Sequence, residues 1–175
     1  MSSDTGLAEL AGWLQPFISA LEPRARRILA ARIADHMQRE VQRNMRAQQA
    51  PDGTPWQERR QRITRKQSLR EYASSARVRN APMMVKLRQA RYLHKAATEH
   101  EAYLTFTGRV LHVATVHHYG LVDKVAPGGP QHVYAERPLL GLSDDGIEAI
   151  RRIVIDQLQS VIEMASKYPQ KVPKK

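Results

Sequence analysis

Four histidines lie close together in the sequence, and imidazole nitrogens are common ligands of metal ions. They are His112, His117, His118 and His132, with Asp123 as the nearest carboxylate and no cysteine in the chain. On a regular strand, His112 and His118 would share one face and His117 would lie on the other. We therefore interpret the four histidines as hydrogen-bonded or solvent-facing side chains, with a metal site as the alternative, and we predict no cofactor.

Patterns that would support catalysis are missing from the sequence. It contains no glycine-rich phosphate-binding loop, no zinc motif with two histidines on one helical face and no serine nucleophile elbow. We therefore predict no catalytic residues and a protein that is not an enzyme.

The most prominent chemical feature is a run of positive charge from Arg59 to Lys95. It contains twelve lysines and arginines and one acid, Glu71, so it alone equals the formal net charge of +11 for the whole chain. Charge this one-sided repels itself unless something negative lies nearby. The candidates are nucleic acid, an acidic protein surface or a membrane, and a solvated basic face without a dedicated partner is the remaining alternative.

Within this run, nine cations are predicted to form an assembly interface that faces acidic groups or DNA. They are Arg59, Arg60, Arg62, Arg65, Lys66, Arg70, Lys86, Arg88 and Arg91. Only two aromatic residues, Tyr72 and Tyr92, lie among them. Proteins that bind single strands without sequence preference usually interleave stacking residues with cations, so this charge suits backbone or surface electrostatics better than base reading. We expect an arm or loop over about residues 57–82, extended or partly helical, with too few apolar residues to hold itself down.

A loop precedes the basic run. Pro51 cannot continue a helix, Asp52-Gly53 is a turn dipeptide, and Pro55 fixes an extended approach to Trp56. A large ring after such a turn usually packs the loop onto the protein. We predict that Asp52, Gly53 and Trp56 anchor this loop, with ligand stacking by the indole as the alternative.

Two amphipathic helices are predicted to frame these residues. Apolar side chains recur every four residues from Leu29 to Met45, which predicts a long helix from Pro23 to about Gln49. A second apolar stripe predicts a final helix that Ser143 begins as a capping residue. The members of this stripe are Ile147, Ile150, Val154, Leu158, Val161, Ile162 and Ala165.

Strands are predicted between the two helices. β-Branched and aromatic residues dominate from Ala102 to Tyr119, which predicts a strand pair with Gly108 at the turn. Gln131–Ala135 is expected to be a third extended piece, and residues 83–95 to be short and helix-like or mixed. The order predicts an α+β fold with a small antiparallel sheet or hairpin. We expect the final helix to pack on the strand pair, because each needs a partner to bury its apolar face.

Length and composition set the remaining expectations. The chain of 175 residues, 42% of them apolar, fits one domain over residues 1–168 with a mobile basic tail at 169–175. The absence of cysteine suits a reducing compartment. No segment resembles a signal peptide or approaches the length of a membrane span, so we predict assembly in the cytoplasm and no membrane partner.

Four segments, taken in order, resemble a known family. They are Gln48–Trp56, Met84–Leu93, Phe106–Val125 and Tyr134–Asp144. Together they resemble the phage virion morphogenesis family, whose members are tail completion proteins of contractile-tailed temperate phages. The resemblance implies a non-enzymatic structural component of the virion that acts late in tail assembly, at the head-proximal end of the tail.

The resemblance also implies the partners. By analogy with proteins of the tail-to-head junction, or neck, the chain would form a ring, a hexamer by the symmetry of the tail tube. Its neighbours would then be tail tube or tail terminator proteins and head-completion or connector proteins. DNA passing through the ring would suit a basic lining. The alternative function is a sequence-independent nucleic-acid-binding protein.

Overall fold

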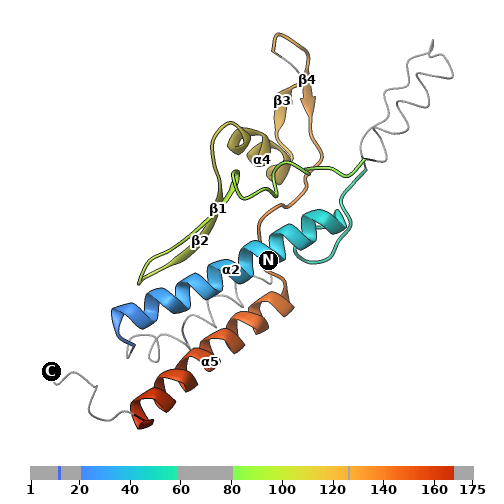
Figure 1. Cartoon of the computed structure of the whole chain (residues 1–175). Helices are drawn as coiled ribbons and strands as arrows, with labels where there is room; N and C mark the ends of the chain where they lie inside the picture. The colour runs from blue at the N-terminus through green and yellow to red at the C-terminus, as the bar shows by residue number, and fades with distance from the viewer. Residues whose placement is uncertain (1–11, 13–20, 59–80, 126, 168–175) are drawn as a thin grey trace. The chain divides into compact units, whose positions relative to one another are not determined.

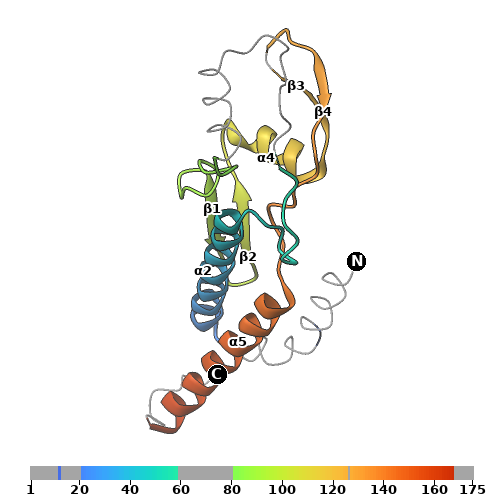
Figure 2. The same cartoon turned by 90° about the vertical axis from the view of Figure 1, so that its right-hand side faces the viewer.

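The computed structural model describes residue 12 and residues 21–58, 81–125 and 127–167 (Figures 1 and 2). Their elements are α2 (Pro23–Ala47), β1 (Leu93–Ala97), β2 (Ala102–Phe106), α4 (Val110–Tyr119), β3 (Val122–Lys124), β4 (Gln131–Val133) and α5 (Asp144–Lys167). These helices, together with two antiparallel sheets of two strands each, confirm the predicted α+β fold. Most of the predicted basic arm, and the predicted tail at 169–175, lie outside the described residues.

The chain divides into two compact units. The first contains residues 1–40, 94–105 and 142–175, and the second contains residues 41–93 and 106–141. Each unit therefore combines segments that are distant in the sequence. The single domain predicted for residues 1–168 stays a prediction.

In the first unit, α2 and α5 lie side by side and share an apolar core (Figure 1). Leu29 on α2 and Val154 on α5 are 2% and 0% exposed. The other buried members of this core are Leu21, Ile147 and Ile150, with Ala25, Ile33, Met37, Leu142, Ile153, Leu158 and Val161 packed against it. The prediction that the final helix packs on a strand pair was therefore wrong. Two long helices with complementary apolar stripes bury those stripes against each other.

The start of α5 confirms the predicted cap. The amide of Gly146 donates to Oγ of Ser143 over 2.9 Å, which satisfies one of the unpaired donors of the first turn. Asp144 and Asp145 place negative charge in that turn, where the helix dipole favours it.

The β1–β2 hairpin also lies beside α2 in the first unit, apart from its end residues Leu93 and Phe106. Lys95 forms an ion pair with Asp35 on α2. The tight turn is at Thr98–Glu101, where the Thr98 amide donates to the Glu101 carbonyl over 2.8 Å. Gly108 does lie in a turn, with φ +68°, but this turn connects β2 to α4 and not two strands as predicted. The end of the segment expected to be helix-like or mixed is a strand.

In the second unit, α4 occupies residues that were predicted to be a strand. Val110–Tyr119 is helical and ends at Gly120, which has φ +64° and donates its amide to the Val116 carbonyl. Gly120 adopts this left-handed conformation without the steric penalty of a Cβ. The valines favoured a strand because of their propensity, and the helix-ending glycine was the opposing signal.

The β3–β4 hairpin follows α4. Val122 lies opposite Val133, and Asp123 opposite His132. β4 confirms the extended piece predicted at Gln131–Ala135. Among the described residues, no helix is long and apolar enough to cross a membrane.

Candidate functional site

The loop after α2 is closed by its own hydrogen bonds. The Ala50 amide donates to the Thr54 carbonyl over 2.8 Å, and the Gly53 amide donates to the Ala50 carbonyl over 3.0 Å. Oδ1 of Asp52 accepts from the Thr54 amide over 2.9 Å, and this backbone hydrogen bond lowers the pKa of Asp52. Gly53 has φ +85°, a conformation that glycine adopts readily.

Trp56 connects this loop to Pro138, which lies 82 residues further along the chain. Its ring is 7% exposed, and Nε1 donates to the Pro138 carbonyl over 3.2 Å. Its amide donates to the Gln48 carbonyl over 2.9 Å, which holds the end of the loop beside the end of α2. Backbone and side chain of Trp56 therefore fix the chain just before the basic run begins.

Arg137 holds the next two residues, although sequence reasoning gave it no role. Its guanidinium is buried, and its Nε and Nη2 donate to the Gln57 carbonyl over 3.1 and 2.8 Å. Nη2 also reaches the Glu58 carbonyl at 3.4 Å, and Nη1 donates to the Ala135 carbonyl over 3.3 Å. The planar guanidinium carries several N–H donors, so it can bind several carbonyl oxygens at once.

Gln48 connects the two flanks of residues 59–80. Its carbonyl accepts from Trp56 on the N-terminal side. Its side-chain amide both donates to the Met83 carbonyl, over 3.1 Å, and accepts from the Met83 amide on the C-terminal side. Met83 and Leu87 are buried, so the C-terminal flank is also packed down. Gln48 has φ +57°, which is uncommon for a residue with a side chain.

The structure describes three of the nine predicted interface cations. Lys86 and Arg91 are exposed, and Arg88 is half-buried. The guanidinium of Arg91 lies 4.7 Å from the ring centre of Tyr92. The carbonyl of Arg88 accepts from the Gln42 side chain over 2.9 Å. The other six, Arg59, Arg60, Arg62, Arg65, Lys66 and Arg70, lie outside the described residues, and the role of all nine at an interface stays a prediction.

An open cavity of about 460 Å³ lies in the second unit next to the Arg137 contacts. Its lining residues are Gln57, Glu58, His117, His132, Val133, Tyr134, Ala135 and Arg137. The Tyr134 ring meets the rings of His117 and His132 edge to face, at 4.9 and 5.2 Å between centres. These ring contacts fix one wall of the cavity.

The strand arrangement assumed for the histidines was wrong, because His112, His117 and His118 lie on the helix α4. Nε2 of His112 lies 2.9 Å from Oδ2 of Asp123. Nδ1 of His118 accepts from the Leu139 amide over 3.0 Å. Within the described ranges, no group of three or more histidine or carboxylate side chains is placed to hold a metal ion.

His118 gives a test of this packing. Burial lowers the pKa of His118 below its ordinary value of 6.5, since the charged ring would be desolvated. The folded protein therefore binds fewer protons at His118 than the unfolded chain does. The contribution of His118 to stability should be complete above pH 6.5 and be lost as the pH falls through the lower, folded-state pKa. Urea unfolding at a series of pH values measures this loss.

The control for this prediction is His118→Asn. The asparagine amide oxygen can replace Nδ1 as the acceptor for the Leu139 amide but does not titrate in this range. The variant should lose the part of the acid destabilisation that is due to His118. If the wild type and the variant respond identically to pH, the assignment to His118 is wrong.

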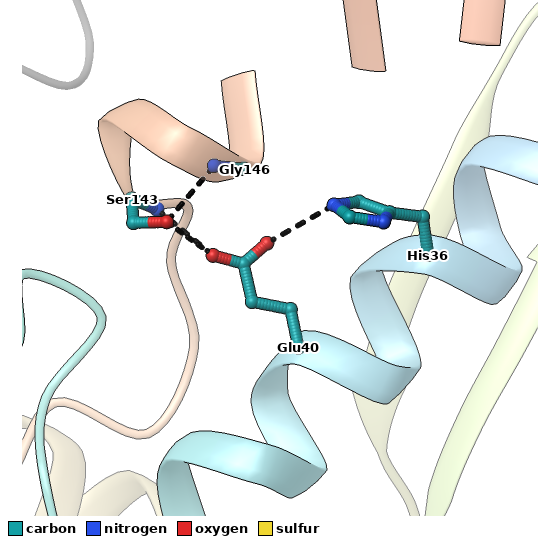
Figure 3. Close-up of polar contacts among 4 residues, drawn as sticks. All are labelled: His36, Glu40, Ser143 and Gly146. Atoms are coloured by element: carbon teal, nitrogen blue, oxygen red, sulfur yellow. Dashed lines mark hydrogen bonds and ion pairs between the residues drawn. The ribbon is translucent and has the colours of Figure 1, made fainter. Parts of the chain in front are cut away.

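In the first unit, a buried carboxylate on α2 contacts the start of α5 (Figure 3). Glu40 is 1% exposed, and its Oε1 accepts hydrogen bonds from the amide and hydroxyl of Ser143. Oε2 lies 3.5 Å from Nε2 of His36. A Cβ at Gly146 would clash with Oε2, so the carboxylate occupies space that only glycine leaves open. Sequence reasoning missed this cluster, because a glutamate on a basic helix gives no sign of burial.

Comparison with known proteins identifies the family. The phage virion morphogenesis family matches residues 6–159 of this chain. The chain belongs to this family.

The chain is similar to a protein named Tail completion protein S, from Escherichia phage P2. It is 34% identical over 147 residues, which are 83% of this chain and 93% of that protein. No solved structure matches the chain. The matched range contains Gln48, Trp56, Arg137 and the whole basic run.

Proposed function

We propose that this protein completes the phage tail at its head-proximal end and forms part of the tail-to-head junction of a tailed phage or prophage. The observation that carries this proposal is the similarity to the phage P2 tail completion protein over nearly its full length. The protein would act as a structural component of the virion and not as an enzyme. It would form a ring, hexameric by analogy, on the tail tube.

The proposed neighbours follow from this position. On the tail side they are the tail tube or tail terminator proteins, and on the head side the head-completion or connector proteins. A ring at this position is threaded by the DNA during ejection, and a basic lining would tolerate the phosphate backbone. Assembly would take place in the host cytoplasm.

A phage or prophage that lacks this gene tests the proposal. Induced lysates should contain filled heads and separate tails instead of complete particles, as seen by electron microscopy. Purified protein added to such a lysate should restore complete particles. Normal numbers of joined particles in the absence of the gene would contradict the proposed function.

The basic run would serve as an assembly surface without sequence preference. Replacing Arg59, Arg60, Arg62 and Arg65 with glutamine should leave the melting temperature unchanged and reduce the yield of complete particles, and the difference from the wild type should shrink at high salt. The reason is that these cations would neutralise acidic or phosphate groups on a neighbour, not support the fold. Infectious particles counted after complementation measure the effect. Normal yields would show that this charge is only a solvated face.

The second candidate function is sequence-independent binding of nucleic acid, which the twelve cations between Arg59 and Lys95 favour. Sedimentation with and without DNA separates the two functions. A dedicated binder should hold DNA as a monomer or dimer with a steep salt dependence. A ring protein should associate with itself or with tail tubes at moderate salt.

A further inference from the structure

The second unit carries an apolar surface that its own described residues leave exposed. Among the described residues, twelve large apolar side chains are exposed, and seven of them lie between positions 111 and 133. They belong to α4 and the β3–β4 hairpin, which follow each other in the chain (Figure 2). We call these seven the α4–hairpin surface: Leu111, Val113, Tyr119, Leu121, Val122, Val125 and Val133.

The composition of α4 requires more burial than its unit supplies. Apolar residues occur all round this helix, yet only Ala114 and Val116 are buried. Leu111 is 49% exposed and Val113 is 44% exposed. A helix that is apolar on all sides is normally enclosed by protein. Another protein surface is therefore expected to cover α4 in the assembled state.

The β3–β4 hairpin also has apolar side chains that its own unit leaves exposed. Val122 and Val133 are direct cross-strand neighbours, and they are 58% and 65% exposed. Asp123 and His132 form the adjacent pair and point to the other face of the two strands. In the described part of the chain, β3 and β4 pair only with each other. An isolated two-stranded sheet is marginally stable in water, so its apolar face needs a partner.

The charge of this region indicates that the partner is a protein. Apart from four histidines, residues 110–135 contain only one acidic and one basic residue, Asp123 and Lys124, and Asp123 already pairs with His112. Depletion of charge is typical of the centre of protein–protein interfaces. Surfaces that bind DNA are strongly basic instead. The α4–hairpin surface is therefore chemically distinct from the basic run in the same unit.

The first unit offers a matching surface on the same chain. It contributes four more of the exposed apolar side chains: Ile28, Tyr103, Ile155 and Ile162. Ile155 and Ile162 are seven residues apart on α5, so they share one helical face. Exposed charges of both signs lie near Ile155 and Ile162 on this helix, namely Arg152, Asp156, Glu163 and Lys167, whereas the exposed cations Arg109 and Lys124 flank the α4–hairpin surface. Charges of both signs around the first-unit side chains can therefore accommodate the two cations of the α4–hairpin surface.

The exposed apolar area is large enough to supply a substantial part of a stable contact. From their exposed fractions, the seven side chains together expose roughly 700 Å² over more than one face of the region, and a standard interface buries about 800 Å² per partner. We propose that the α4–hairpin surface docks on the first unit of a second copy of this chain. A contact between two different surfaces of identical chains is head-to-tail and closes into a ring when the rotation permits. This inference rests on the proposed function, because it supplies the subunit contact of the proposed ring.

The test compares Val133→Lys with Val85→Lys by sedimentation velocity over a range of concentrations. Val85 is a matched control, since it is also exposed but lies outside the α4–hairpin surface. The wild type and Val85→Lys should associate with concentration, and Val133→Lys should need at least about tenfold more protein, because a buried charge opposes docking. All three should melt at the same temperature. Val122→Lys, on the neighbouring strand, replaces Val133→Lys if that variant melts early.

A mixing experiment tests the head-to-tail geometry. Ile162→Lys alters the first unit and should also weaken self-association, while leaving the α4–hairpin surface intact. An equimolar mixture of Val133→Lys and Ile162→Lys should then form dimers and stop there, because each pair retains only one intact contact. Normal association of Ile162→Lys would overturn the assignment of the first unit as the docking site.

Two further outcomes separate this inference from the proposed function. If Val133→Lys associates as the wild type does, the inference is wrong, and complementation of the gene deletion still reports on tail completion. If it associates normally but fails to complement, the α4–hairpin surface contacts a different virion protein and the second copy is excluded. If the wild type, but not Val133→Lys, binds vesicles of neutral phospholipid, the inference that the α4–hairpin surface binds a protein is wrong.

Discussion

Replacing Gly146 with alanine should destabilise the protein by about 2–3 kcal/mol, because the Glu40 carboxylate must leave both of its hydrogen bonds to Ser143 to make room. Within a helix the same substitution ordinarily stabilises by up to about 1 kcal/mol. The expected sign is therefore the reverse of the usual one. Denaturant unfolding followed by circular dichroism measures the change in the free energy of unfolding.

The matched control is the same substitution in a Glu40→Ala background. Without the carboxylate, nothing among the atoms that crowd Gly146 remains to oppose a Cβ, since all three nearest atoms belong to the Glu40 side chain. Gly146→Ala should then be neutral or stabilising, and the double-mutant cycle should show strong coupling between the two positions. Equal effects in both backgrounds would mean that the buried carboxylate does not exclude the methyl group.

Replacing Trp56 with alanine should lower the free energy of unfolding by about 3–5 kcal/mol, because a large buried ring is removed and a cavity remains. Trp56 is 7% exposed and belongs to the second unit, residues 41–93 and 106–141. The whole second unit should therefore unfold at a lower denaturant concentration in the variant. Trp56→Phe keeps most of the apolar contact and loses only the hydrogen bond to the Pro138 carbonyl. It should cost about 1 kcal/mol beyond any repacking.

A different result would reassign the indole. If Trp56→Ala loses less than about 1 kcal/mol in purified protein, yet particles fail to complete, the ring acts at an interface. If neither stability nor particle yield changes, the anchoring role is wrong.

The helices were predictable because periodicity is a local signal. The stripe from Leu29 to Met45 and the cap at Ser143 gave α2 and the start of α5 within two residues. The pairing of those helices was not predictable, since an apolar stripe shows that a partner is needed but not which partner. The valines of α4 were misread because strand propensity in a short run is weak against tertiary context and a helix-ending Gly120.

The residues of the candidate site were also only partly predictable from the sequence. Trp56 was predictable as a buried ring because prolines and a turn dipeptide fix its approach. Arg137 and Gln48 were not, because each acts on backbone carbonyls and amides, which every residue carries and no sequence pattern marks. Glu40 was hidden for a related reason, since its burial depends on a glycine more than a hundred positions away.

The two contacts of Gln48 have a consequence for the tolerance of this chain to insertions. The same residue contacts Trp56 on one side and Met83 on the other, so the two described flanks are held at one place. An insertion between those points leaves both anchors in register, and doubling its length adds only about 0.6 kcal/mol of closure entropy. A longer, shorter or differently charged stretch between these two anchors should therefore leave the fold of the supporting unit intact.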